Sequence, residues 1–211
     1  MAKSDDNLFL PKDILEALAL LSRLPLPTSD HDRGARAAWA YPLAGLVLGA
    51  LAALTGLIAH ALGLPAPLTA FVVLATLVVC TGALHEDGLA DTADGLWGGW
   101  TRDRRLEIMK DSRIGAYGVI ALVLGLSARW AALWILFEMG PTVAAAGILV
   151  TASLSRATMP ALMSALPNAR ESGLSQQVGR VPRSTAMLAV GIATVITVVL
   201  TGTGAFGAVF W

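Results

Sequence analysis

Long apolar segments alternate with short polar connections along most of this chain of 211 residues. Five segments are long enough to cross a bilayer as helices, because a spanning helix needs about 20 apolar residues. They are Tyr41–Leu64, Pro67–Leu84, Gly115–Met139, Thr142–Leu166 and Thr185–Phe206. Small residues such as Gly45 and Gly49 recur in them and allow helices to approach closely in lipid. The pattern predicts an all-α, polytopic membrane helical bundle of about five spans, forming one domain over residues 1–211.

A shorter amphipathic pattern precedes the first span. It begins at Pro11, a residue favoured in the first turn of a helix, and ends before Pro25, because proline disfavours helix at the preceding residue. Its apolar positions recur every three or four residues, at Ile14, Leu15, Leu18 and Leu21. Lys12, Asp13 and Glu16 lie on the opposite side, and the short length predicts an interfacial or re-entrant helix rather than a span.

Composition and charge placement support a membrane protein with a defined orientation. Hydrophobic residues make up 55% of the chain, charged residues 14%, and the net charge is zero. Mean hydropathy is +0.67, too apolar for an ordinary soluble domain. The zero net charge gives no electrostatic basis for a nucleic-acid partner. All Lys and Arg outside the predicted spans fall in residues 1–40, 85–114 and 167–184, so the positive-inside rule places these three regions in the cytoplasm.

Four carboxylates occur within nine residues directly after the second apolar segment. They are Glu86, Asp87, Asp91 and Asp94. In a helix, the three aspartates are spaced four and three apart and therefore share one face. Like charges so close together repel unless a cation lies among them, and carboxylate oxygens suit a hard ion such as Mg²⁺ or Mn²⁺. The alternative interpretation is an acidic, solvated loop without a function of its own.

Glycines and basic residues follow the acidic run. Gly95, Gly98 and Gly99 allow a tight reversal of the chain close to a bound ligand. Thr101 can cap a short helix, which is followed by Lys110-Asp111-Ser112-Arg113. Carboxylates, a metal ion and Lys or Arg side chains together can bind a pyrophosphate and neutralise the charge that develops on it. The pattern therefore predicts phosphoryl transfer at the cytoplasmic face of the membrane.

Two arginines lie inside predicted spans, where an unpaired charge is costly. Arg156 is two turns from the cytoplasmic end of the fourth span and could reach an anionic ligand. For Arg129, in the third span, a structural ion pair and a functional role are equally consistent with the sequence.

The acidic run His85–Gly95 and the stretch Met109–Gly115 resemble the cobalamin synthase family, the adenosylcobinamide-GDP ribazoletransferases. Shorter matches occur in the same order as in that family, at Arg23–Pro27, Tyr41–Gly45, Ser155-Arg156 and Ala169–Leu174.

The resemblance implies a multi-pass enzyme of the bacterial inner membrane with a cytoplasmic active site. It would join adenosylcobinamide-GDP to α-ribazole or α-ribazole 5′-phosphate, release GMP and require Mg²⁺. Further partners expected are the lipid bilayer and either a second copy of the chain or other enzymes of the pathway. The implied catalytic residues are Glu86, Asp87, Asp91 and Asp94, with the three aspartates as metal ligands. The implied phosphate-binding residues are Lys110, Asp111, Arg113 and Arg156.

Other membrane proteins share part of the pattern. CDP-alcohol phosphotransferases carry an arginine where this chain has Asp91, and UbiA-type prenyltransferases carry two separate acidic motifs. A divalent-cation transporter would hold its carboxylates at mid-membrane, and a structural membrane protein would not need them. Cobalamin synthases usually continue with a further Gly-Asp-containing segment and additional spans, so this chain is expected to insert and bind metal but to turn over poorly.

Overall fold

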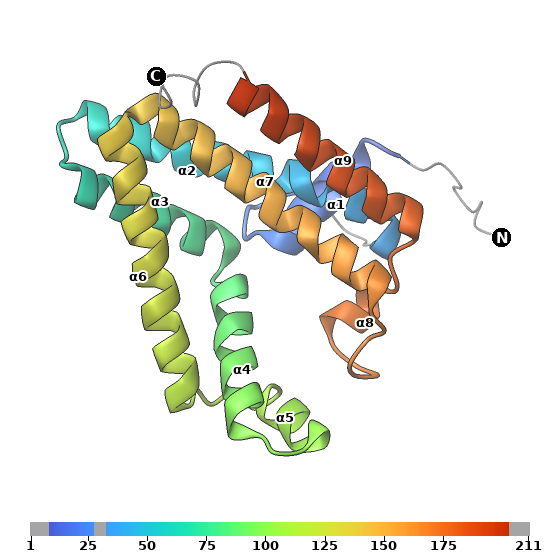
Figure 1. The fold of residues 1–211 in the computed structure, drawn as a ribbon. Coiled ribbons are helices and arrows are strands. Elements are labelled where there is room, and N and C mark those ends of the chain that lie inside the picture. The colour runs from blue at the N-terminus through green and yellow to red at the C-terminus, as the bar shows by residue number, and fades with distance from the viewer. Residues whose placement is uncertain (1–8, 28–32, 203–211) are drawn as a thin grey trace. The chain divides into compact units, whose positions relative to one another are not determined.

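The computed structural model describes residues 9–27 and 33–202, and Figure 1 shows their fold. Within these ranges the chain forms helices and no strands, which confirms the all-α prediction. The α-helices are α1 Lys12–Leu21, α2 Tyr41–Ala61, α3 Ala66–Thr81, α4 Leu84–Gly98, α5 Arg102–Ile108, α6 Ala116–Met139, α7 Pro141–Ala165, α8 Leu174–Val178 and α9 Arg183–Leu200. A 3₁₀ helix, η1 Gly34–Ala40, leads directly into α2.

In the part of the chain that the structure describes, four helical segments are long and apolar enough to cross a membrane. These are η1 together with α2, then α6, α7 and α9. The bent pair of α3 and α4 would make a fifth, in agreement with the predicted number of spans. The last part of the predicted fifth span, from residue 203, lies outside the described residues.

The second predicted span, Pro67–Leu84, is not a single spanning helix but the first part of a bent pair of helices. Helix α3 ends at Thr81 after 16 residues, which is about 24 Å of helix and shorter than a hydrocarbon core of about 30 Å. Gly82 (φ 61°) and Ala83 (φ 58°) both adopt left-handed backbone conformations. They turn the chain by 86° into α4, so the acidic run begins a new helix at a sharp bend.

The chain forms two compact units. Unit 1 comprises residues 1–50 and 149–211, and unit 2 comprises residues 51–148. Helices α2 and α7 contribute residues to both. The buried core of unit 2 brings together residues of α2, α3, α6 and α7, namely Ala52, Ala53, Val73, Phe137, Ala144 and Ile148.

In unit 1, two of the three charged residues on the polar side of α1 are buried, whereas Lys12 is exposed, and the interfacial or re-entrant placement of α1 stays a prediction. The bounds of α1 agree with the sequence, but Asp13 is fully buried and Glu16 is 7% exposed. Asp13 Oδ1 lies 2.8 Å from Arg33 Nε, and Asp13 Oδ2 accepts a hydrogen bond of 2.7 Å from Trp39 Nε1. The partners are 20 and 26 residues away in sequence, so helical periodicity alone could not reveal them.

Gly45 allows a close contact between α2 and α7 within unit 1. A Cβ atom at this position would collide with the carbonyl of Ala152 and would crowd the side chain of Arg156. The prediction that this glycine serves helix packing is therefore confirmed, and the packing brings Arg156 against α2.

Candidate functional site

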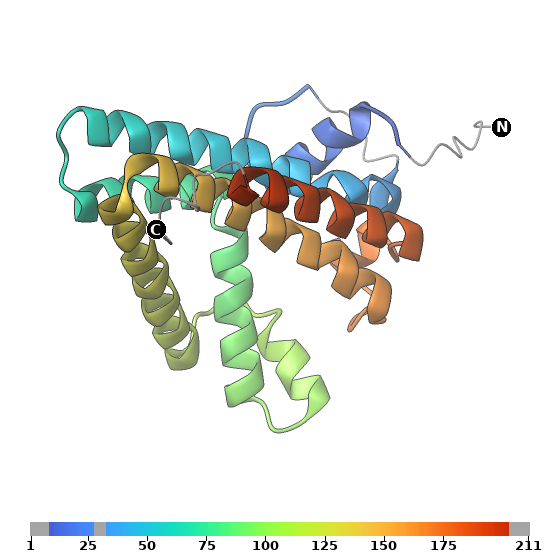
Figure 2. The same ribbon diagram turned by 45° about the horizontal axis from the view of Figure 1, so that its top comes forward.

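Helix α4 carries the acidic run and packs against α6 in unit 2. Figures 1 and 2 show α4 and α6 side by side, with α5 beside the end of α4 that is farther from α3. Asp94 contacts the start of α6, whereas Glu86, two turns earlier in α4, contacts Arg129 farther along α6. The two helices are therefore antiparallel, and α4 presents different carboxylates to different depths along α6.

The carboxylate of Asp94 caps the N-terminus of α6. Its Oδ2 accepts a hydrogen bond of 2.7 Å from the backbone N–H of Gly115, and its Oδ1 accepts one of 2.8 Å from Gly118. The first N–H groups of a helix lack partners within the helix, and the positive end of the helix dipole favours a carboxylate. Cβ atoms at Gly115 or Gly118 would collide with this carboxylate, so both glycines are needed for the contact.

Glu86 and Arg129 form an ion pair between α4 and α6. Arg129 lies eleven residues beyond Gly118, which is about 16 Å along the axis of α6 at about 1.5 Å per residue. The side chain of Glu86 is 9% exposed and that of Arg129 is 44% exposed. Of the two roles that the sequence left open for Arg129, the structure supports the structural ion pair.

We predict that Arg129→Met lowers the free energy of unfolding by about 1–2 kcal/mol, because Glu86 then remains buried without its cation. The double variant Glu86→Gln/Arg129→Met should lose less than the sum of the two single variants. The exposed pair Arg104–Glu107 is the matched control, for which we expect a coupling of about 0.5 kcal/mol or less. Chemical unfolding in mixed micelles measures the full double-mutant cycle, and additive losses for Glu86 and Arg129 would show that the pair does not stabilise α4 on α6.

Helix α5 folds back onto the end of α4. Cβ atoms at Gly95 and Gly99 would collide with Met109 and Arg105, so the two glycines allow α5 to pack closely. The sequence predicted a tight reversal here, which is confirmed, but the space beside Gly95 and Gly99 is filled by α5 itself. As predicted, the side chain of Thr101 caps α5, accepting a hydrogen bond from the backbone N–H of Arg104.

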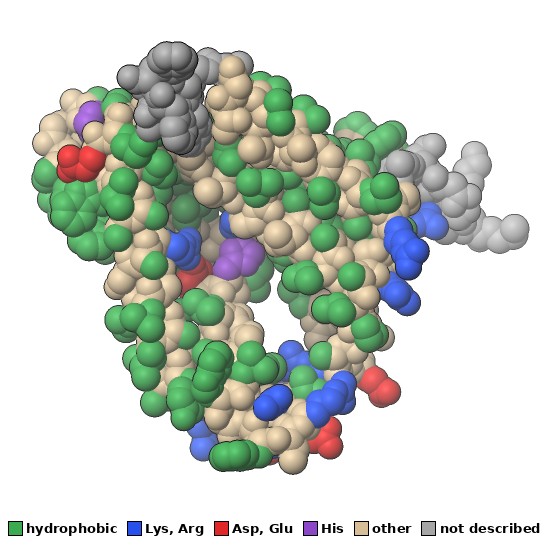
Figure 3. Space-filling view, viewed as in Figure 1, with side chains coloured by type: hydrophobic (Ala, Val, Ile, Leu, Met, Phe, Trp, Pro, Cys, Tyr) green, Lys and Arg blue, Asp and Glu red, His purple; other side chains and the backbone are tan. Residues whose placement is uncertain are grey.

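This packing brings two of the three aspartates into one cavity with the basic stretch. A cavity of about 280 Å³ is lined by residues of α4 and of the connection between α5 and α6, including Asp87, Asp91, Lys110, Asp111 and Arg113. Figure 3 shows charged side chains gathered around α5, whereas the side of α6 carries mainly hydrophobic ones. Carboxylates and cations around one cavity are the groups that a metal-bound phosphate needs.

Asp94 does not line this cavity. It lines a neighbouring one of about 330 Å³, which also includes Asp111 and Arg113. Asp111 and Arg113 thus lie between the two cavities, and Arg113 Nε is 3.8 Å from Asp111 Oδ2. The acidic face of α4 therefore divides into Asp87 and Asp91 at one cavity and Asp94 at the start of α6.

Among the described residues, no group of three or more Asp, Glu, His or Cys side chains is arranged to hold a metal ion. Asp87 and Asp91 line the same cavity as the basic stretch, so we take them as the first two candidate carboxylates, and Asp94 as a third metal ligand stays a prediction. Magnesium sites in phosphate-binding proteins commonly use one or two carboxylates, with water and phosphate oxygens completing the octahedron. The donors present fit such a site, and metal binding stays a prediction.

Arg156 lies in unit 1, whereas the other predicted site residues lie in unit 2. It is 9% exposed, and its Nη1 donates a hydrogen bond of 3.0 Å to Ser155 Oγ. Its predicted contact with phosphate stays a prediction. Sequence reasoning missed the roles of Gly115 and Gly118. The sequence does contain a signal for these roles. Two glycines three residues apart stand at the start of an apolar segment, soon after the predicted acidic helix.

The sequence of this chain matches a known protein family over most of its length. The profile of the cobalamin-5-phosphate synthase family matches residues 13–211. A protein of Bradyrhizobium diazoefficiens called adenosylcobinamide-GDP ribazoletransferase is 44% identical over 195 residues, covering 91% of this chain and 74% of the relative. Proteins with the same name from Azorhizobium caulinodans (45% over 203 residues, 92% and 77%) and Sinorhizobium medicae (42% over 193 residues, 89% and 74%) are similar as well. No solved structure matches the chain.

Proposed function

The chain belongs to the cobalamin-5-phosphate synthase family, and from this premise we propose how it works as an adenosylcobinamide-GDP ribazoletransferase. It is a membrane-helix transferase of cobalamin synthesis that transfers ribazole to adenosylcobinamide-GDP. The finer proposal is a Mg²⁺-dependent phosphoryl transfer at the cytoplasmic membrane face, with α-ribazole or its 5′-phosphate as acceptor. The observation that carries it is the cavity at which Asp87 and Asp91 of α4 meet Lys110 and Arg113.

In the proposed reaction, a ribose hydroxyl oxygen of the acceptor forms a bond to the phosphorus on the cobinamide side of the pyrophosphate. The bond from that phosphorus to the bridging oxygen breaks, and the oxygen leaves with its electron pair as part of GMP. The hydroxyl proton passes to a carboxylate of Asp87 or Asp91 or to water. Phosphoryl transfer through a loose transition state asks little of a base, so positioning and charge neutralisation contribute most of the rate.

Each group of the cavity has a proposed role in this step. Asp87 and Asp91 would hold Mg²⁺, which when bound would neutralise charge on the pyrophosphate and on the departing GMP. Lys110 and Arg113 bind phosphate oxygens, and Arg113 offers a planar fork for two of them. Asp111, 3.8 Å from Arg113 Nε, orients that guanidinium.

The remaining predicted residues have supporting roles in the proposal. Glu86 is the weakest candidate for the proton acceptor, because its carboxylate already pairs with Arg129. Asp94 holds the start of α6 and with it the connection that carries Lys110 and Arg113. Arg156, in unit 1, is proposed as an additional phosphate ligand.

Product analysis tests the proposed function. The chain is reconstituted in nanodiscs and supplied with adenosylcobinamide-GDP, α-ribazole and Mg²⁺. GMP and the corrinoid product are then separated by chromatography and identified by mass spectrometry. We expect equal amounts of GMP and adenosylcobalamin, and no GMP after chelation of divalent ions. GMP release that is unaffected by chelator would contradict the metal-dependent step, and a corrinoid product without the ribazole would contradict the transfer.

The proposed orientation predicts which positions label from each side of the membrane. With Cys80 replaced, cysteines at Arg104 and Arg180 should react with a membrane-impermeant maleimide only from the cytoplasmic side, because they lie in regions rich in Lys and Arg. Cysteines at Leu62 and Met139 should react only from outside. These two positions flank Gly63 and Gly140, whose positive φ angles would strain a cysteine placed there. Labelling of position 104 from outside would overturn the orientation.

A further inference from the structure

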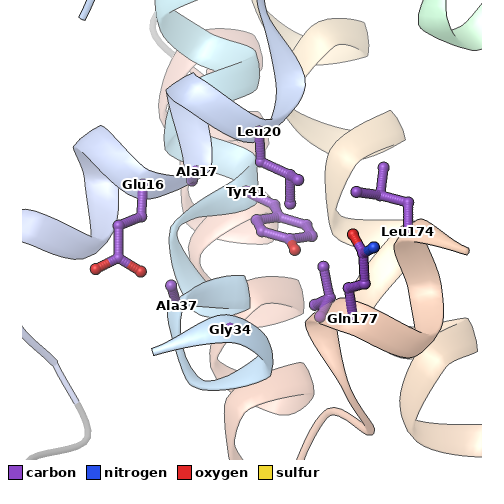
Figure 4. A pocket seen from close by; sticks show the side chains of 9 residues that line it. Glu16, Ala17, Leu20, Gly34, Ala37, Tyr41, Leu174 and Gln177 are labelled. Carbon is purple, nitrogen blue, oxygen red and sulfur yellow. The ribbon is translucent and has the colours of Figure 1, made fainter. Parts of the chain in front are cut away.

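A third cavity, of about 220 Å³, lies within unit 1 and takes no part in the proposed chemistry above. It is lined by residues of α1, η1, α8 and the first residue of α2 (Figure 4). Three polar side chains from three different helices line it, Glu16, Tyr41 and Gln177. A Cβ atom at Gly34 would lie 2.7 Å from the carbonyl oxygen of Val178, so η1 and α8 are in close contact at one edge of the cavity.

Glu16 is the unusual residue of this cavity. It is 7% exposed, and its Oε2 atom is buried without a hydrogen-bond partner among the described residues. Asp13, one turn earlier in the same helix, is also buried, but Arg33 and Trp39 both bind its carboxylate. Leaving a buried carboxylate without a donor is unfavourable. A ligand that donates a hydrogen bond would supply the missing partner.

The lining limits the chemistry of that ligand. Among the described residues that line the cavity, Glu16 is the only acid, whereas a divalent cation needs about six oxygen ligands. None of these described residues is Lys or Arg, so a phosphate group would meet a carboxylate without a compensating cation from them. The walls between the polar groups are aliphatic and include Leu20 and Leu174. An uncharged organic molecule with an apolar, planar part and at least one hydroxyl donor fits these walls.

We infer that this cavity binds the acceptor nucleoside, α-ribazole, an inference that rests on the proposed function. The nucleoside combines a flat aromatic base, which would pack between the aliphatic walls, with ribose hydroxyls. One hydroxyl donates a hydrogen bond to Glu16, and the phenol of Tyr41 and the amide of Gln177 bind further polar atoms. In the 5′-phosphate form of the acceptor, the phosphate remains outside the cavity, because the described part of the lining offers it no cation.

Steady-state kinetics of GMP release by the full chain in nanodiscs tests this inference. Glu16→Gln should raise the KM for α-ribazole by about tenfold to a hundredfold, since a hydrogen bond to a charged group is weakened. The KM for adenosylcobinamide-GDP should change by less than about twofold. Glu138→Gln makes the same chemical change at an exposed glutamate of unit 2 and should leave both KM values unchanged.

A second variant keeps the test decisive if Glu16→Gln does not fold. Leu20→Trp narrows the cavity without changing its charge and should also raise the KM for α-ribazole. Leu15→Trp, an exposed position on the same helix outside the cavity, is its control. If Leu20→Trp and every folded Glu16 variant keep the wild-type KM for α-ribazole while GMP is still released, the inference is wrong and the proposed function stands.

Equilibrium dialysis with α-ribazole alone measures binding without catalysis. It can therefore support the cavity assignment even if the proposed function is wrong. The Asp91→Asn protein should still bind α-ribazole, because Asp91 is not among the residues that line this cavity, and Glu16→Gln should bind it at least about tenfold more weakly. If the wild-type chain released no GMP but bound α-ribazole in this Glu16-dependent way, the proposed function would fail and the cavity assignment would stand. Equal binding by wild type, Glu16→Gln and Leu20→Trp would overturn the assignment.

Discussion

Asp87→Asn and Asp91→Asn should each lower kcat for GMP release by on the order of 10²–10³-fold, while the protein remains folded in the membrane. Asparagine keeps the size of the side chain and one oxygen, but it removes the negative charge that a hard cation requires. Both side chains line the cavity that also contains Lys110 and Arg113, so the loss of charge falls where the phosphate is expected to bind.

The matched control is Asp103→Asn, an exposed aspartate in the first turn of α5 that lines neither this cavity nor the neighbouring one. We expect its kcat to stay within about twofold of wild type, because exposed charges contribute little. Rates are measured as GMP release at saturating Mg²⁺, with the folded yield checked by size-exclusion chromatography. An acidic surface without a function predicts that all three variants behave alike, and that result would remove Asp87 and Asp91 from the site.

Asp94→Ala should instead lower the stability of the protein, by about 3 kcal/mol or more in the free energy of unfolding. Two hydrogen bonds between a carboxylate and backbone N–H groups are lost, each worth about 1.5–3 kcal/mol, and the first turn of α6 is left without its cap. Asp94→Asn keeps one acceptor oxygen and should lose about half as much. Asp94 is 7% exposed, so water cannot readily replace the lost partner.

The control for Asp94 is Asp91→Ala, one turn earlier on the same helix. Because Asp91 is only partly buried, its removal should cost about 1 kcal/mol or less. Unfolding in mixed micelles compares the two variants directly. If they unfold alike and both are inactive, Asp94 acts as a third metal ligand, as the sequence alone suggested. A large difference in stability supports Asp94 as the helix cap.

Periodicity and apolar length predicted most of the helices, because a spanning helix depends mainly on its own composition. Helices α2, α6 and α7 lie close to the predicted segments, and the acidic run is helical as expected. The form of the second span could not be predicted, since Ala83 adopts a left-handed conformation that alanine disfavours. After this bend α4 packs along α6, a contact between segments distant in sequence.

The same limitation explains what the sequence could not show about the acids of α1 and α4. A helical pattern shows which side of α1 is polar, but it cannot show that Arg33 and Trp39 approach that side and bury Asp13. The spacing of Asp87, Asp91 and Asp94 correctly placed them on one face of a helix. It could not show that the backbone N–H groups of Gly115 and Gly118 donate hydrogen bonds to Asp94, which caps α6. Residue types indicated the chemistry of the site. Which residue has which role depends on contacts between segments that are distant in sequence.

Direct detection of the metal tests the central claim, that Asp87 and Asp91 hold a divalent ion at the phosphate-binding cavity. Mn²⁺ is titrated into the nanodisc-embedded protein with adenosylcobinamide-GDP present and followed by electron paramagnetic resonance, with ³¹P couplings to the bound ion measured by electron–nuclear double resonance. We predict one bound Mn²⁺ with ³¹P couplings in the wild type and in Asp103→Asn, and loss of this signal in the Asp87→Asn/Asp91→Asn double variant. Equal Mn²⁺ affinity and equal ³¹P couplings in the double variant and the wild type would contradict the claim.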